Sequence, residues 1–217
     1  MGNHYLYVNE RDWRMIDITK DYTNKGVWEP ETTKIVQAEV RPGQTALDIG
    51  ASIGYFSLLL AEQVGKNGRV ISFEPTDGNF KYLKHNIKKN KYKNIEPHQL
   101  AAWNKSEQVQ VMQHSFTHCV RQGIAIDDFL ERHNIYPIDF IKLDIDGADL
   151  KALQGLERTI QRNKHLKMVC EYYPKYLQKL GEVPDDFLNF VEKYFDITVL
   201  NDYDTDHWNF YCVRKQE

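Results

Sequence analysis

The stretch ALDIGASIGYFSLLLAEQV, residues 46–64, joins an apolar run of strand type to a helical pattern through a turn of small residues. Gly50 and Gly54 lie in that turn, and glycine permits backbone angles and close approaches that a Cβ atom forbids. In open α/β sheets, ligands bind beyond the carboxyl ends of the strands, where such a turn is placed. The turn therefore predicts a ligand that contacts backbone here, with a tight strand-to-helix connection as the simpler alternative.

Strand-like and helix-like runs alternate along the chain from about residue 45 onward. The expected strands are residues 45–50, 69–75, 94–103, 108–113, 138–147, 166–174, 195–200 and 208–214. The expected helices are residues 54–65, 77–90, 126–133, 148–162 and 184–195. This alternation predicts one α/β domain, residues 41–217, with a mostly parallel sheet and helices on both faces. The short connection 201–207 predicts a closing antiparallel hairpin, and residues 1–40 are expected to form an N-terminal flank or lid.

Composition narrows the class of protein. The 28 basic and 31 acidic residues give a formal charge of −3, which by itself indicates neither a nucleic-acid nor a membrane partner. Cys119, Cys170 and Cys212 form no CxxC pair, which argues against a disulfide framework or a structural zinc site and fits a reducing compartment. No signal-peptide pattern is visible, and no apolar run reaches the ~18–20 residues of a membrane span. We therefore expect a cytoplasmic protein without membrane association.

An acidic residue ends the second expected strand. Glu74 lies twenty-six residues past Asp48, at a position where a carboxylate accepts hydrogen bonds from a ribose diol in nucleotide-binding sheets. The turn itself has the pattern D-x-G-x-x-x-G rather than the G-x-G-x-x-G of dinucleotide sites, and it lacks the GK[ST] of a P-loop. An anionic pyrophosphate gains nothing from Asp48, whereas the ammonium and sulfonium of S-adenosylmethionine tolerate it. These features favour S-adenosylmethionine as the ligand.

Three stretches carry a resemblance to a known family. They are VWEPETTKIVQAEVRPGQTALDIGASIGYFSLLLA (27–61), VISFEPTDGNFKYLKHNI (70–87) and IDFIKLDIDGADLKALQG (138–155). They resemble the FkbM-type S-adenosylmethionine-dependent methyltransferases, and the resemblance continues more weakly through VCEYYP (169–174) to the end. It implies a class I methyltransferase (Rossmann-like) fold, with a mostly parallel seven-stranded sheet whose last strand is antiparallel.

The resemblance also implies roles for individual residues. The methionine part of the cofactor would be lined by Asp48, Gly50, Ala51, Ser52, Gly54 and Asp144. The ribose would be held by Glu74, with Pro75 beside it. The adenine would lie against Ala101, Ala102 and Trp103, and Glu29 would approach the cofactor from the flank. The family usually has a longer glutamate at the position of Asp146.

A second acidic cluster, in the sequence KLDIDGAD, ends the strand expected at residues 138–147. It is no EF-hand loop, because its glycine is at the fourth position and a strand precedes it. Asp149 is interpreted as an acid favoured by the positive end of a helix. Strand alternation points Asp144 toward the transferred methyl group, so Asp144 is the first candidate for a general base, with Glu171 as a helper. Asp144, Asp146 and Glu171 together are an alternative Mg²⁺ site.

A histidine and a basic run each allow either a functional interpretation or a purely structural one. His118, in the loop-like HSFTHC (114–119), is a candidate auxiliary base. The basic run KHNIKKNKYKN (84–94) is interpreted as a solvated face rather than a nucleic-acid site, because no aromatic platform accompanies it.

The leading hypothesis is an O-methyltransferase that methylates a hydroxyl of a sugar or another small natural-product acceptor. The acceptor class follows from the resemblance. A nicotinamide-dependent oxidoreductase is one alternative, disfavoured by the absent third glycine and the antiparallel end of the sheet. A cofactor-binding module without catalysis is another alternative.

Overall fold

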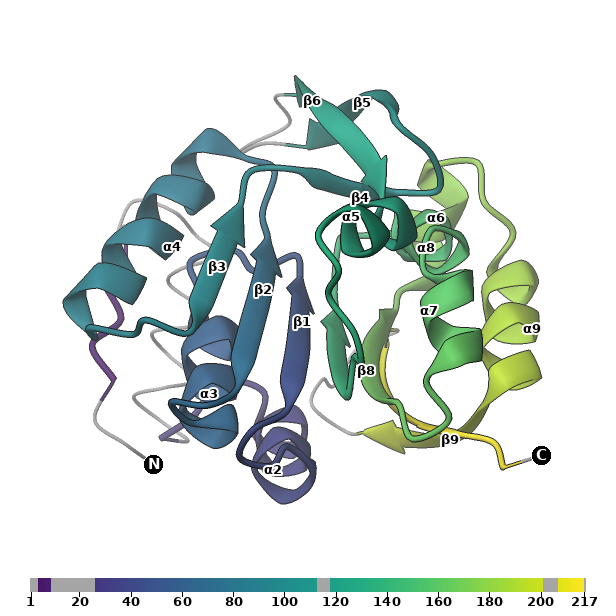
Figure 1. Ribbon diagram of the computed structural model, residues 1–217. Coiled ribbons are helices and arrows are strands. Elements are labelled where there is room, and N and C mark those ends of the chain that lie inside the picture. The colour runs from purple at the N-terminus through teal and green to yellow at the C-terminus, as the bar shows by residue number, and fades with distance from the viewer. Residues whose placement is uncertain (1–3, 9–25, 113–117, 201–206, 217) are drawn as a thin grey trace.

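A seven-stranded sheet forms the centre of the molecule, which the computed structural model describes over residues 4–8, 26–112, 118–200 and 207–216. The strand order is β3-β2-β1-β7-β8-β10-β9 (Figure 1). The strands are β1 (Thr45–Ile49), β2 (Arg69–Phe73), β3 (Ile95–His98), β7 (Phe140–Leu143), β8 (Lys167–Tyr172), β9 (Phe195–Leu200) and β10 (Trp208–Arg214). The first five in this order are parallel, whereas β10 is antiparallel to both β8 and β9. The expected mixed sheet with an antiparallel last strand is confirmed.

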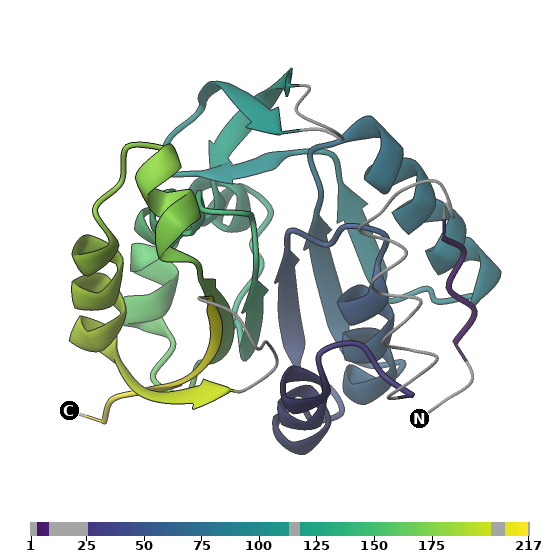
Figure 2. The same ribbon diagram turned by 180° about the vertical axis from the view of Figure 1, so that it is seen from behind.

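Helices cover both faces of this sheet, as Figures 1 and 2 show from opposite sides. One side carries α2 (Pro30–Glu39), α3 (Tyr55–Val64) and α4 (Asp77–Lys89). The other carries α5 (Ile126–Arg132), α6 (Asp149–Gln154), α7 (Glu157–Arg162) and α9 (Pro184–Tyr194), with α8 (Pro174–Lys179) following β8. Successive residues of a strand pack on opposite faces of the sheet, because side chains alternate along a strand. Thus Ala46 packs in the core cluster with α3, whereas Leu47 packs in the cluster with α6.

A second, three-stranded sheet lies across the carboxyl ends of β1, β2 and β3, at the top of Figure 1. It contains β4 (Ala101–Trp103), β5 (Glu107–Met112) and β6 (His118–Ala125) in the order β4-β6-β5. The prediction of one strand over residues 94–103 was wrong. Pairing with β2 stops at His98, opposite the last β2 residue Phe73, and β4 then pairs with β6 instead. His118 was also misplaced in a loop, since it is the first residue of β6.

The single helix expected at residues 148–162 is two helices, α6 and α7, separated at Gly155 and Leu156. A Cβ atom on Gly155 would lie 2.0 Å from the carbonyl oxygen of Trp103. The backbone of β4 therefore packs directly against the break, and only glycine allows this approach.

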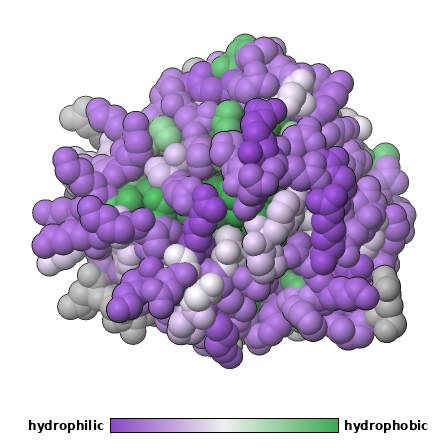
Figure 3. All heavy atoms as spheres, in the orientation of Figure 1, coloured by the Kyte–Doolittle hydropathy of each residue, from purple (hydrophilic) through white to green (hydrophobic). Residues whose placement is uncertain are grey.

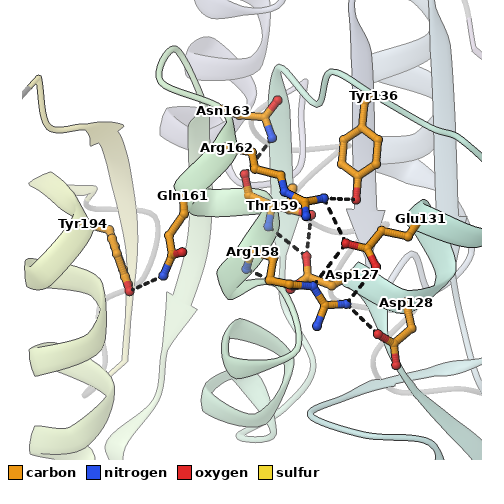
Figure 4. A network of polar contacts seen from close by, with 10 residues as sticks. All are labelled: Asp127, Asp128, Glu131, Tyr136, Arg158, Thr159, Gln161, Arg162, Asn163 and Tyr194. Carbon is orange, nitrogen blue, oxygen red and sulfur yellow. Dashed lines mark hydrogen bonds and ion pairs between the residues drawn. The ribbon is translucent and has the colours of Figure 1, made fainter.

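A network of polar contacts joins α5 to α7 (Figure 4). The buried Asp127 accepts hydrogen bonds from the backbone nitrogens of Arg158 and Thr159, both at 2.8 Å. It thereby caps the first turn of α7, whose amide groups have no partner within the helix. The Arg158 guanidinium adds ion pairs with Asp128 and Glu131 at the surface. The two helices thus hold each other below the small sheet.

Part of the N-terminal flank is also described. Helix α2 packs against α3 and β10, and residues 4–8 lie along α4 (Figure 2). Residues 9–25 lie outside the described residues, so the expected lid remains a prediction. No helix among the described residues has the length and apolarity to cross a membrane.

Candidate active site

The glycine turn after β1 contacts the loop after β7. Gly50 has φ +87°, and a Cβ atom built on it would lie 1.8 Å from the carbonyl oxygen of Asp144. The approach of these two loops by itself requires glycine at position 50, so the tight-connection interpretation is sufficient for this residue. Gly54, with φ +98°, immediately precedes α3, and Ser52 also has a positive φ of 49°.

Glu74 connects the turns that follow β1 and β2. Its Oε2 accepts a hydrogen bond from the Ser52 backbone nitrogen at 2.9 Å. Its Oε1 accepts from the Thr76 backbone nitrogen at 2.8 Å and from the Thr76 hydroxyl at 2.6 Å. Burial raises the pKa of Glu74, although these hydrogen bonds oppose the shift. Pro75 follows, and its carbonyl accepts a hydrogen bond from Arg121 Nε of β6 at 2.7 Å.

Asp48 is buried at the carboxyl end of β1, where it accepts a hydrogen bond from the Ser57 hydroxyl of α3. Ser57 also contacts the Ser72 hydroxyl at 2.8 Å. Burial raises the pKa of Asp48 to about 6, against the opposing effects of Ser57 and Lys142.

We expect Asp48→Asn to remove one pH-dependent contribution to folding. The pKa of Asp48 is raised from 3.8 to about 6 in the folded chain, so ionisation costs stability as the pH rises between these values. The asparagine does not titrate, so raising the pH from 4 to 7 should favour the variant over the wild type by about 2 kcal/mol. Urea unfolding at both pH values measures this difference.

The exposed Asp196→Asn is the matched control for Asp48→Asn and should show no such change. A difference between wild type and Asp48→Asn that stays constant from pH 4 to 7 would contradict the assignment.

Lys142 is the main functional candidate that the sequence analysis missed. Its ammonium lies 3.0 Å from Asp144 Oδ2 and 3.8 Å from Glu29 Oε2, with only 1% of the side chain exposed. It also lies 5.0 Å from the ring centroid of Phe56. Burial opposes the charge, but Asp144 and Glu29 outweigh burial and hold the pKa of Lys142 above its ordinary value. The signal was present in the sequence as a lysine within an apolar strand, two residues before Asp144 and so on the same face.

Lys142, Asp144, Glu29 and Glu171 form a charged cluster that is largely buried. Asn209, the register partner of Glu171, donates hydrogen bonds to Glu29 Oε2 and to the Thr32 hydroxyl, both at 3.0 Å. Glu171 Oε2 is buried and has no hydrogen-bond partner among the described residues. Burial, and then the charges of Asp144 and Asp149, raise the pKa of Glu171 well above its usual range.

The two other acids of the second acidic cluster, Asp146 and Asp149, lie in different environments. Asp146 is exposed, whereas Asp149 is buried and accepts hydrogen bonds from the backbone nitrogens of Ile145 at 3.3 Å and Gly147 at 3.0 Å. Burial, and then the charge of Asp144, raise the pKa of Asp149 to about 7. Asp149 therefore holds the loop after β7, a larger role than a favourable position at a helix end.

The alternative Mg²⁺ site at Asp144, Asp146 and Glu171 gains no support. In the part of the chain that the structure describes, no group of three or more His, Cys, Asp or Glu side chains is arranged to hold a metal ion. Instead, the Lys142 ammonium supplies the positive charge next to Asp144.

Other predicted residues lie in the small sheet. Ala101 and Ala102 are buried, and the half-buried Trp103 donates its indole N–H to Glu107 Oε1 at 2.8 Å. His118 is exposed, and no hydrogen bond or ion pair among the described residues joins it to the charged cluster. The structure thus brings together Glu29, Asp48, Glu74, Asp144 and Glu171 at the carboxyl edge of the sheet and leaves His118 apart.

A family model described as the methyltransferase FkbM domain matches residues 48–198, more than half of the chain. The chain belongs to this family. The resemblance noted in the sequence is therefore confirmed. The matched segment contains β2, β3, β7 and β8 of the central sheet, the end of β1 and most of β9, whereas β10 lies outside it.

Solved structures support the FkbM-domain fold. An FkbM methyltransferase of Methylobacillus flagellatus superimposes with a TM-score of 0.58 at 19% identity, covering 95% of this chain and 56% of that chain. A putative rRNA-methylase of Clostridium thermocellum superimposes with a TM-score of 0.62 at 12% identity, covering 87% of this chain and 96% of that chain. A putative methyltransferase of Streptococcus mutans in complex with S-adenosylhomocysteine gives 0.57 at 11% identity, covering 85% and 96%. At these identities the likeness shows the class I methyltransferase fold alone.

Curated relatives of this FkbM-domain chain match over short segments. An arsenite methyltransferase of Halobacterium salinarum is 36% identical over 59 residues, which cover 27% of this chain and 15% of that protein. A protein-L-isoaspartate O-methyltransferase of Aeropyrum pernix is 40% identical over 55 residues, covering 25% and 21%. The chain therefore matches less than a quarter of each relative's own length.

Proposed function

We propose that this FkbM-domain chain is an S-adenosylmethionine-dependent methyltransferase that methylates a hydroxyl of a sugar or another small-molecule acceptor. The observation that carries the proposal is the charge of the carboxyl edge. Five carboxylates lie there, those of Glu29, Asp48, Glu74, Asp144 and Glu171. Among the described residues, the one buried ammonium is that of Lys142, which pairs with Glu29 and Asp144. Such an edge suits a ligand with an ammonium and a sulfonium and disfavours the pyrophosphate of a dinucleotide.

The ribose of the cofactor would bind at Glu74. Three hydrogen bonds from Ser52 and Thr76 fix its carboxylate, which as a group offers about four acceptor positions. The turn after β1 would hold the methionine part, and Ala101, Ala102 and Trp103 would lie beside the adenine. When bound, S-adenosylmethionine supplies a methyl group on a sulfonium that leaves readily.

A hydroxyl acceptor must lose its proton, and Glu171 is the acceptor of that proton in this proposal. Asp144 shares its carboxylate with the Lys142 ammonium at 3.0 Å, so part of its charge is already neutralised. Glu171 has a carboxylate oxygen with no hydrogen-bond partner among the described residues, and burial raises its pKa. Its ionised form is correspondingly basic. Lys142 and Asp144 would position the groups around it.

The first test is cofactor binding by Glu74→Gln. The substitution removes the charge that strengthens hydrogen bonds from the ribose, so the affinity for S-adenosylhomocysteine should fall roughly ten- to a hundredfold. Isothermal titration calorimetry measures the dissociation constants of both proteins.

Glu96→Gln is the matched control, because Glu96 lies on the neighbouring strand β3 and pairs with Arg69. It should bind like the wild type. An unchanged affinity in Glu74→Gln would place the ribose elsewhere. The reaction itself is tested by transfer of a labelled methyl group from S-adenosylmethionine to hydroxylated acceptors.

A further inference from the structure

Lysines cover one side of α4 and the loop that follows it. They are Lys81, Lys84, Lys88, Lys89, Lys91 and Lys93. Among the residues that the structure describes, none of the six forms an ion pair with a carboxylate. The only acid within α4, Asp77, is paired with Arg121. This side is therefore locally positive, although the whole chain has a formal charge of −3.

An extended segment, residues 4–8, is attached to this side by two asparagines. Asn90 exchanges hydrogen bonds with the backbone of Tyr5, at 2.8 Å and 2.7 Å. Asn86 does the same with the backbone of Tyr7, at 2.8 Å and 3.2 Å. Four residues of helix rise ~6 Å, close to the ~6.6 Å that two residues of extended chain span. The spacing of the asparagines thus matches the spacing of the tyrosines.

The attached segment places aromatic rings among the lysines. Tyr7 stacks on Tyr82 with ring centroids 5.6 Å apart and an angle of 25°, and its centroid lies 5.1 Å from that of His85. Tyr5 and Tyr7 remain 65% and 56% exposed. The Lys89 ammonium lies 5.8 Å from the ring centroid of Tyr5. The sequence interpretation that no aromatic platform accompanies the basic run was therefore wrong, because the platform comes from a distant part of the chain.

An open pocket of about 570 Å³ lies between these groups, lined by Tyr5, His85, Lys88, Lys89 and Lys91. The space-filling view shows a hydrophilic surface along the edge of the molecule that α4 forms, on the left of Figure 3. We define Tyr5, Tyr7, Lys88, Lys89 and Lys91 as the α4 surface.

We propose that the α4 surface binds single-stranded nucleic acid. Unpaired bases would stack on the exposed rings of Tyr5 and Tyr7, and the unpaired lysines would contact phosphates. Duplexes expose no base faces, so the stacking contribution is confined to single strands. An acidic membrane is a weaker fit, because the large apolar side chains exposed near α4 in the described residues are tyrosines, with no leucine, phenylalanine or tryptophan among them. The surface does not depend on the proposed methyl transfer, and its test uses no cofactor.

The test is fluorescence anisotropy with labelled twelve-nucleotide oligo-U and oligo-dT and with a twelve-base-pair duplex, at 50 mM and 200 mM salt. The wild-type chain should bind the single strands more tightly than the duplex. Tyr5→Ala and Tyr7→Ala should each weaken binding by about tenfold or more, and phenylalanine at either position should retain it. Lys88→Gln combined with Lys89→Gln should lower the slope of log affinity against log salt by about 1.4.

Tyr136→Ala, at an exposed tyrosine on another part of the surface, and Lys179→Gln are the matched controls and should bind like the wild type. Unchanged melting temperatures would show that the tyrosine variants remain folded, as expected for exposed side chains. Absence of binding at 50 mM salt, equal affinity for the duplex, or full affinity in both alanine variants would overturn the proposal. Binding to acidic phospholipid vesicles in place of oligonucleotides would also overturn it and assign the surface to membranes.

Discussion

Glu171→Gln is expected to slow methylation of a hydroxyl acceptor by about 10²–10⁴-fold, the usual cost of losing a general base. Glutamine keeps the size of the side chain but cannot take up the proton. The Glu171 side chain is buried, and its Oε2 has no hydrogen-bond partner among the described residues, so the substitution breaks no hydrogen bond of that oxygen. Turnover with any hydroxylated acceptor that the wild type methylates, together with the dissociation constant for S-adenosylhomocysteine, separates chemistry from binding.

Asp144→Asn is the comparison variant for Glu171→Gln. It should lower turnover less, because Asp144 acts through its contact with Lys142 in this account. Wild-type turnover in Glu171→Gln with slow turnover in Asp144→Asn would return the role of base to Asp144. A pH profile adds a second readout, since only loss of the base should remove the limb that reports its ionisation.

Lys142→Met is expected to destabilise the folded chain by about 3–5 kcal/mol at neutral pH, a large part of the stability of a typical domain. Methionine fills similar space but leaves Glu29 and Asp144 without the buried ammonium that contacts both. Removing one partner of a buried ion pair is costly because the remaining charges then have no counter-charge beside them. Urea unfolding at pH 7 measures the effect.

Lys151→Met is the matched control for Lys142→Met. Lys151 pairs with Glu182 at 2.9 Å, but 29% of its side chain is exposed. Ion pairs of this kind contribute ~0–1 kcal/mol. A loss in Lys142→Met no larger than that of Lys151→Met would show that the buried cluster does not depend on its lysine.

The sequence predicted the central sheet well because its strands are continuous apolar runs separated by clear helix patterns. It also predicted which acids lie at the carboxyl edge, since parallel strands end at the same edge of a sheet. Asp48, Glu74, Asp144 and Glu171 each lie within one residue of the end of a strand, and the structure brings them to that edge. For Gly50, the sequence could not separate a ligand contact from a backbone contact, because the obstructing atom is the carbonyl of Asp144.

The remaining features depend on contacts between distant residues. The break between β3 and β4 follows from the end of β2 and from pairing with β6, neither of which leaves a local pattern in residues 94–103. The pairing of Lys142 with Glu29 joins residues from the flank and from the fourth parallel strand of the sheet. The same holds for Tyr7, which stacks on Tyr82 while Asn86 hydrogen-bonds to the backbone of residue 7.

We expect an S-adenosyl ligand to bind at the carboxyl edge of β1 and β2, and a crystal structure of the chain with S-adenosylhomocysteine would show the binding site itself. The ribose hydroxyls should lie within hydrogen-bond distance of Glu74, and the sulfur on the side of Asp144 and Glu171. Ligand density at any other place, or no density in crystals grown at saturating ligand, would contradict it.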